Sequence, residues 1–188
     1  MNSMIKVGGT LLAFSAAAAL LLAGTNQLTA PVIEQRNIAA SNAARKEVLP
    51  VAKDFKQLDA AKYSSAGAST VTEVFEGTDG SSTVGYTIKA NPSGYGGAVE
   101  LTIGINKDGK IMGVSVGNNT ETPGLGAKAA DPAFNGQYKD KEAKPLEVIK
   151  SGSPADNQIK AISGATITSR AVTDGVNEAI QVFEAVNK

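Results

Sequence analysis

The stretch that decides the fold is residues 98–116, which read AVELTIGINKDGKIMGVSV. Apolar and polar residues alternate on both sides of the tetrapeptide at residues 106–109. Such alternation places every second side chain on one face of a strand. The Asp108-Gly109 pair supplies the positive φ angle that a tight turn needs. These residues therefore predict an antiparallel β-hairpin with one buried face.

Two shorter alternating runs precede the hairpin, at residues 71–75 and 84–88, and they predict further strands. Residues 131–149 have a mixed pattern in which we expect one short helix, at 133–138.

The C-terminal segment, residues 169–187, has apolar residues at helical spacing and predicts an amphipathic helix packed on the sheet. These apolar residues are Val172, Val176, Ala179, Ile180 and Phe183. Strands in the middle and a helix at the end predict one α+β domain over residues 52–188.

The N-terminal part is an apolar run with no charged residue from Val7 to Ile33. As a helix, this run is long enough to cross a hydrocarbon core of about 30 Å. A cleaved signal peptide or a buried core helix would also be apolar, but the run exceeds the roughly 7–15 apolar residues of a signal peptide. We therefore expect residues 1–30 to form a retained, single transmembrane helix. Lys6 on its short side favours a cytoplasmic N-terminus and a domain outside the cytoplasm.

Between anchor and domain, residues 31–51 read as a helical stalk. Pro31 predicts a break or a kink at its start, and Pro50 predicts its end.

The composition excludes several kinds of site. The sequence contains no Cys, His or Trp, so iron–sulfur clusters held by Cys, haem held by His, and zinc or copper sites built on imidazole or thiolate are excluded. A Ser-His-Asp or Cys-His nucleophile is excluded as well. With 18 basic and 18 acidic residues, the chain has no basic field for nucleic acid. Redox chemistry would have to come from an organic cofactor, and no metal site is expected.

Three segments combine Gly and hydroxyl residues where the pattern is neither strand nor helix: 94–97 (GYGG), 119–126 (NTETPGLG) and 162–169 (ISGATITS). In the first, the glycines permit either close approach to a flat ligand or a plain loop. In the second, Leu125 stands between two glycines and is a suitable platform for a planar ring, although Pro-Gly alone predicts only a turn. The third leads into the terminal helix, where a phosphate would be favoured. Thr168 or Ser169 could equally be simple helix caps there.

The third segment resembles the flavinylation motif of the FMN-binding domain family. The residues that carry the resemblance are Ser163-Gly164-Ala165-Thr166, followed by Ile-Thr-Ser and a helix. This family includes the G subunit of the Rnf ferredoxin–NAD oxidoreductase complex and the C subunit of the sodium-pumping NADH–quinone reductase. The resemblance implies that an FMN-transferase joins the phosphate of FMN to the Thr166 hydroxyl.

Residues 94–97 and 121–126 resemble further motifs of this family in the same order, which implies that they line the flavin, with Thr122 and Leu125 nearest the ring. One position departs from the family pattern, because Lys160 stands where an acidic residue is usual, and Asp156 is the nearby alternative. The implied FMN-binding residues, none of them catalytic, are Thr166, Ser163, Gly164, Ala165, Thr168, Tyr95, Gly96, Glu121, Thr122, Gly124 and Leu125.

The short length and the anchor resemble the G subunit of the Rnf complex more than the C subunit of the reductase. The implied function is that of an electron carrier, not an independent catalyst, in a membrane-bound Rnf-type complex coupled to sodium or proton transport. Its implied partners are other membrane and iron–sulfur subunits and the FMN-transferase. Two alternatives stay open: the FMN-bearing component of a sodium-pumping NADH–quinone reductase, and a membrane-anchored scaffold domain without a cofactor.

Overall fold

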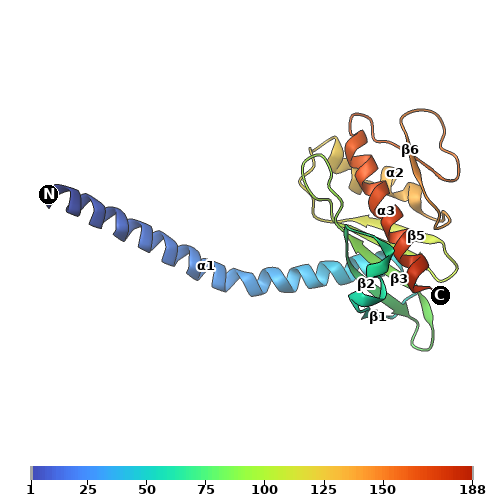
Figure 1. Cartoon of the computed structure of the whole chain (residues 1–188), viewed down its shortest axis with the longest axis horizontal. Coiled ribbons are helices and arrows are strands. Elements are labelled where there is room, and N and C mark those ends of the chain that lie inside the picture. The colour runs from blue at the N-terminus through green and yellow to red at the C-terminus, as the bar shows by residue number, and fades with distance from the viewer. Residues whose placement is uncertain (1, 188) are drawn as a thin grey trace. The chain divides into compact units, whose positions relative to one another are not determined.

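The computed structural model describes residues 2–187. The chain divides into two compact units, Met1–Asn42 and Ala43–Lys188. The first unit is helical, and the second contains every strand that the described residues form. Figure 1 shows the elements along the chain.

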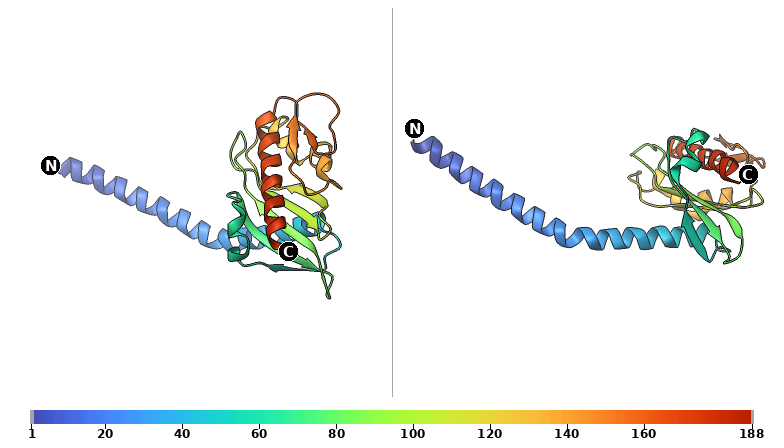
Figure 2. Two further views of the ribbon diagram at one scale, coloured as in Figure 1. Left: turned by 45° about the vertical axis from the view of Figure 1, so that its right-hand side comes forward. Right: turned by 60° about the horizontal axis from the view of Figure 1, so that its bottom comes forward.

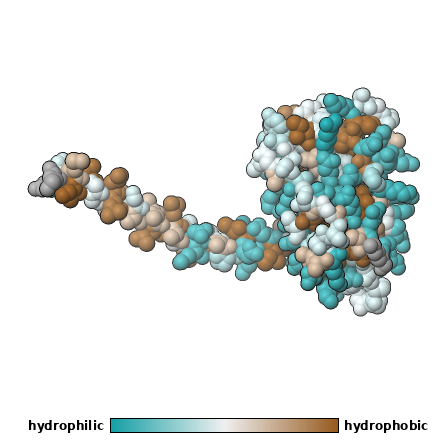
Figure 3. Space-filling view, in the orientation of Figure 1, coloured by the Kyte–Doolittle hydropathy of each residue, from teal (hydrophilic) through white to brown (hydrophobic). Residues whose placement is uncertain are grey.

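Helix α1 (Asn2–Val48) continues through Pro31. Pro31 was expected to break or to kink the helix, and the expected break is therefore wrong. Among residues 2–187, α1 is the one helix long and apolar enough to cross a membrane. Its large apolar side chains, such as Leu11, Phe14 and Leu21, are exposed. Figure 3 shows brown, hydrophobic patches along the helix. The helix ends two residues before Pro50.

The second unit is built on a five-stranded antiparallel sheet in the order β1-β2-β3-β4-β5. The predicted hairpin is confirmed as β4 and β5, with Ile103 opposite Val114 and Gly109 at φ +78° in the turn. The strands are β1 (Asp54–Gln57), β2 (Val71–Thr78), β3 (Thr83–Ala90), β4 (Leu101–Asn106) and β5 (Ile111–Val116).

Helix α3 (Thr166–Val186) packs on one face of this sheet, as predicted, and its apolar residues join those of β3 and β4 in the core. Tyr86 and Phe183 meet edge to face, with their ring centroids 6.0 Å apart. Figure 2 shows α3 lying along the strands. The helix begins three residues earlier than predicted, at Thr166.

The opposite face is covered by the last turn of α1 and the residues after it, all within the second unit. Val48 and Leu49 are buried there. Glycines make this close approach possible. A Cβ atom at Gly104 would collide with the Val48 carbonyl oxygen, and one at Gly77 would lie 2.7 Å from Cδ2 of Leu49.

Short elements complete the domain. The expected helix at 133–138 is present in two pieces, α2 (Pro132–Asn135) and the 3-10 turn η4 (Gly136–Tyr138). Tyr138 is fully buried, and its hydroxyl forms a hydrogen bond of 2.7 Å with Thr173 Oγ1. Burial raises the pKa of this hydroxyl. The others are η1 (Ala60–Lys62), η2 (Ser64–Ala66), η3 (Gly126–Ala130) and a parallel pair, β6 (Glu147–Ile149) with β7 (Gln158–Lys160).

Candidate functional site

The beginning of α3 has no side-chain cap. The cap residue is Ala165, which follows Gly164 at φ +77°. The first amide groups of a helix have no partner within the helix. At this helix start they point toward a position where an anion would be stabilised.

The two residues expected as simple caps have other partners. The Thr168 hydroxyl donates to Oε2 of Glu121 at 2.6 Å. The Ser169 hydroxyl donates to the Ala165 carbonyl at 2.9 Å and accepts the Ile162 N–H at 3.0 Å. The capping role suggested for Thr168 or Ser169 is therefore wrong, and the scaffold alternative loses the structural role that it gave these hydroxyls.

Glu121 joins the three segments. Its carboxylate is buried, with 6% of the residue exposed, and it accepts the Gly96 N–H at 2.9 Å and the Thr168 hydroxyl. A Cβ atom at Gly94 or Gly126 would collide with this carboxylate, so a side chain at either position would displace it from its hydrogen bonds. Across the described residues Glu121 has no ion-pair partner.

The first two segments also contact each other directly. The Thr120 hydroxyl donates to the Gly96 carbonyl at 2.9 Å, and a Cβ atom at Gly96 would collide with the Thr120 carbonyl oxygen. Gly97 has φ +149°, in the region that favours glycine. Close approach of this loop to Thr120 therefore explains the glycines at positions 96 and 97.

The three segments enclose a cleft of about 560 Å³. This volume lies within the range of about 300–1,000 Å³ that is usual for cofactor sites. The lining residues are Tyr95, Glu121, Thr122, Leu125, Gly126, Gly164, Ala165, Thr166, Ile167 and Thr168.

Eight of the eleven residues named from the sequence line this cleft. Gly96 does not line it, but its N–H donates to Glu121, which does. Gly124, at φ +78°, shapes the turn before Leu125. Ser163 lines an adjacent hollow instead.

Two lining residues were not singled out from the sequence: Gly126, expected only as part of a segment that lines the flavin, and Ile167. Ile167 is 56% exposed, and the signal that could have revealed it is an apolar residue between two threonines at a helix start. Together with Tyr95 and Leu125, it gives the cleft exposed apolar side chains above the polar Glu121 and Thr168. That combination suits a planar ring with a polar tail.

Comparison with known proteins agrees with this geometry. The FMN-binding domain family matches residues 94–181, a range that contains all three segments, and the RnfG N-terminal region matches residues 1–48. The G subunit of the Na(+)-translocating ferredoxin:NAD(+) oxidoreductase complex of Acetobacterium woodii is 42% identical over 98% of this chain and 94% of its own. Its counterpart in the proton-translocating complex of Clostridium ljungdahlii is 34% identical over 96% of this chain and 91% of its own.

The chain belongs to the RnfG family, the G subunits of ion-translocating ferredoxin:NAD(+) oxidoreductase complexes. The N-terminal region of the RnfG family ends at Val48, which is also the last residue of α1. The FMN-binding part lies wholly within the second unit.

The α+β fold of this RnfG-family domain is shared with solved structures of NqrC. The Shewanella oneidensis protein has a TM-score of 0.50 and 23% identity, and covers 61% of this chain and 58% of its own. The C subunit of the Na(+)-translocating NADH-quinone reductase from Parabacteroides distasonis has a TM-score of 0.50 and 20% identity, and covers 78% of this chain and 92% of its own.

Proposed function

We propose that this chain carries FMN in the cleft at the start of α3 and relays electrons within a membrane-bound ferredoxin–NAD oxidoreductase complex that transports sodium ions or protons. The observation that carries the proposal is the meeting of three separate segments in one cleft that ends at Thr166. Membership of the RnfG family supports both the cofactor and the complex.

Thr166 is the residue through which FMN would be attached, by a phosphoester to its hydroxyl. This hydroxyl forms no hydrogen bond with the described part of the chain, and Thr166 is the first residue of α3. A phosphate placed there would gain about 0.3–1 kcal/mol from the helix dipole at an exposed site. A phosphoester tether would keep FMN from dissociating on the outer side of the membrane.

The remaining lining residues would hold and orient the cofactor. Tyr95, Leu125 and Ile167 offer apolar surface to the ring. The buried Glu121 keeps the loop at residues 94–97 and the helix start in register. FMN itself supplies the electron-transfer chemistry, so the chain has no need of a catalytic His or Cys.

Helix α1 would anchor the chain, with the short N-terminus in the cytoplasm and the FMN domain on the extracytoplasmic side. Maturation would need an FMN-transferase, and electron transfer would need the membrane and iron–sulfur subunits of the complex. The similarity to the NqrC structures concerns the fold alone. The 42% sequence identity to the Acetobacterium woodii G subunit, over 98% of this chain, favours the RnfG assignment.

A reconstituted complex tests the proposed function. Complexes containing the wild-type chain should reduce NAD with electrons from ferredoxin, and complexes containing Thr166→Val should assemble equally well but lose this activity. Co-purification of the other components checks assembly. Full ferredoxin-dependent NAD reduction by the assembled Thr166→Val complex would refute the proposal.

A further inference from the structure

Thr166 lies between two hollows. One is the cleft just described. The other has a volume of about 460 Å³, and its lining includes Lys150, Lys160, Gly164 and Thr166. Because Thr166 and Gly164 line both hollows, a group on the Thr166 hydroxyl can extend into either.

The two hollows have opposite charge. The second contains two lysines and no acidic residue, whereas the cleft contains the Glu121 carboxylate and no basic residue. Within residues 2–187 neither Lys150 nor Lys160 forms an ion pair. A phosphate at Thr166 would therefore be attracted to Lys150 and Lys160 and repelled by the Glu121 carboxylate in the cleft.

The fold brings the two lysines together. Strands β6 and β7 are parallel, with Ile149 opposite Lys160, so their C-terminal ends lie at the same edge. Gln137 fixes the backbone of Lys160, accepting its N–H at 2.8 Å and donating to its carbonyl at 3.2 Å. This edge leads directly into residues 161–165 and α3.

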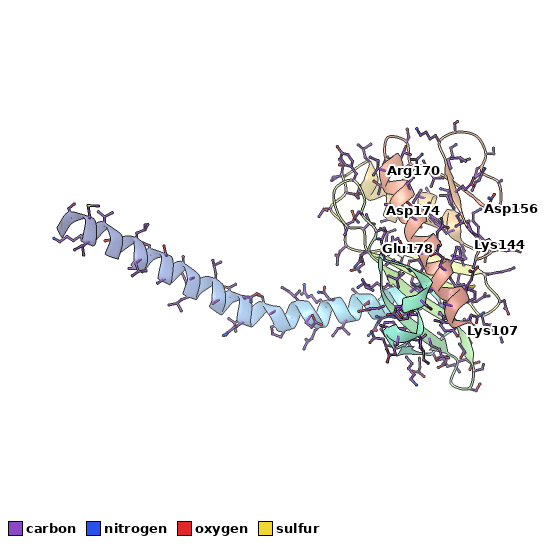
Figure 4. All side chains as sticks on the ribbon, viewed as in Figure 1. Lys107, Lys144, Asp156, Arg170, Asp174 and Glu178 are labelled. Carbon is purple, nitrogen blue, oxygen red and sulfur yellow. The ribbon has the colours of Figure 1, made fainter. Side chains whose placement is uncertain are left out.

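The acidic alternative suggested by the sequence does not share this hollow. Asp156 lines a third hollow, together with Lys139, Lys141 and Lys144, and the Lys141 ammonium donates to the Asp156 carbonyl at 2.6 Å. Figure 4 shows Asp156 and Lys144 on one side of the domain, while Arg170 marks the first part of α3. The charged residues that share the second hollow with Thr166 are thus the two lysines.

We propose that Lys150 and Lys160 bind the phosphate group of FMN, while the ring occupies the cleft on the other side of Thr166. This assignment rests on the proposed function, since it takes FMN as the ligand. It gives Lys160, which replaces the usual acidic residue of the family pattern, a role of its own in this chain.

Titration of the full chain with two flavins tests the assignment. The chain is produced without an FMN-transferase, purified in detergent, and titrated with FMN and with riboflavin, which lacks the phosphate. The Lys150→Gln/Lys160→Gln double variant should bind FMN about three- to tenfold more weakly, as expected for two exposed ion pairs. Its riboflavin affinity should equal that of the wild type. High salt should reduce the FMN affinity of the wild type more than that of the variant.

Two matched variants serve as controls. Lys150→Arg/Lys160→Arg keeps both charges and should keep the preference for FMN. Lys53→Gln/Lys107→Gln removes two exposed lysines elsewhere and should bind both flavins as the wild type does; Figure 4 shows Lys107 beside the C-terminal end of α3.

The outcomes separate the two proposals. An unchanged FMN affinity in the double glutamine variant, or an equal fall in the Lys53→Gln/Lys107→Gln control, overturns the phosphate site but leaves FMN binding in place. A wild-type chain that binds FMN no better than riboflavin also overturns the phosphate site and leaves FMN binding in place. A wild-type chain that binds neither flavin also overturns the phosphate site, while the proposed function, which attaches FMN covalently, is tested by the reconstituted complex.

Discussion

Among single residues, Glu121 links the separate segments of the site. Its carboxylate accepts hydrogen bonds from Gly96 and Thr168, which are 25 and 47 positions away in the sequence. Such contacts leave no local pattern, so this linking role could not be predicted, although Glu121 itself could be named by resemblance. The same holds for Gly126, whose lack of a side chain matters only because Glu121 and Thr168 lie beside it.

Truncation of Glu121 should destabilise the domain. Glu121→Ala leaves the Gly96 N–H and the Thr168 hydroxyl without their acceptor, at a cost of about 1–3 kcal/mol in the free energy of unfolding. Glu121→Gln keeps an oxygen acceptor and should cost less. Urea denaturation of the purified chain measures both, and equal stability of Glu121→Ala and the wild type would show that these bonds contribute nothing.

Among the elements, the hairpin of β4 and β5 could be predicted together with its turn, because alternation and Asp-Gly are both local signals. The start of α3 could not. Three of the four residues in its first turn, Thr166–Ser169, carry hydroxyls, and the apolar period of the helix begins only at Val172. The hydroxyls of Thr168 and Ser169 bind Glu121 and the preceding chain, which no periodicity reveals.

The contact between Val48 and the sheet depends on a glycine. In Gly104→Ala the new methyl group would collide with the Val48 carbonyl oxygen, and we expect a loss of about 1–3 kcal/mol in the free energy of unfolding, as for other overpacked sites. Gly136→Ala is the matched control, because Gly136 has helical φ and ψ and no atom within 4 Å of the added Cβ. Equal thermal midpoints for the two variants would contradict this packing.

The turn between β2 and β3 makes a prediction about pH. The backbone N–H groups of Ser81 and Ser82, with the Ser81 hydroxyl, lower the pKa of Asp79 from 3.8 to about 2. Because the pKa is lower in the folded chain, the stabilisation is fully present above about pH 4 and is lost as the pH falls through about 2. An NMR titration of the Asp79 carboxyl carbon should have its midpoint near 2, and a midpoint near 3.8 would contradict the turn geometry.

For the whole molecule, hydropathy predicts the part of α1 that could lie in lipid but not the full extent of the helix. The sequence divides residues 1–51 into an anchor and a stalk, whereas the structure has one helix from Asn2 to Val48. Pro31 removes a single backbone donor, and the surrounding helix tolerates that loss. The last turn belongs to the domain, because Val48 is buried against the sheet.

The proposed orientation can be tested with engineered cysteines, because the natural sequence contains none. Ser151→Cys lies in an exposed loop of the FMN domain, and Ser3→Cys lies before the apolar run. The test uses cells from which any outer membrane or cell wall has been removed and in which the inner membrane is intact. A membrane-impermeant maleimide should label Ser151→Cys in these cells, and it should label Ser3→Cys only after the membrane has been permeabilised. The reverse pattern would place the domain in the cytoplasm.

The measurement closest to the central claim is the intact mass of the denatured chain, purified from cells that contain the FMN-transferase. The wild-type chain should carry the added mass of one FMN bound as a phosphoester, mapped to the peptide that contains Thr166. Thr166→Ala should have the mass of the bare polypeptide and no flavin fluorescence in a denaturing gel, with an unchanged circular dichroism spectrum. A wild-type chain without the added mass, or a Thr166→Ala chain that still carries it, would contradict covalent attachment at Thr166.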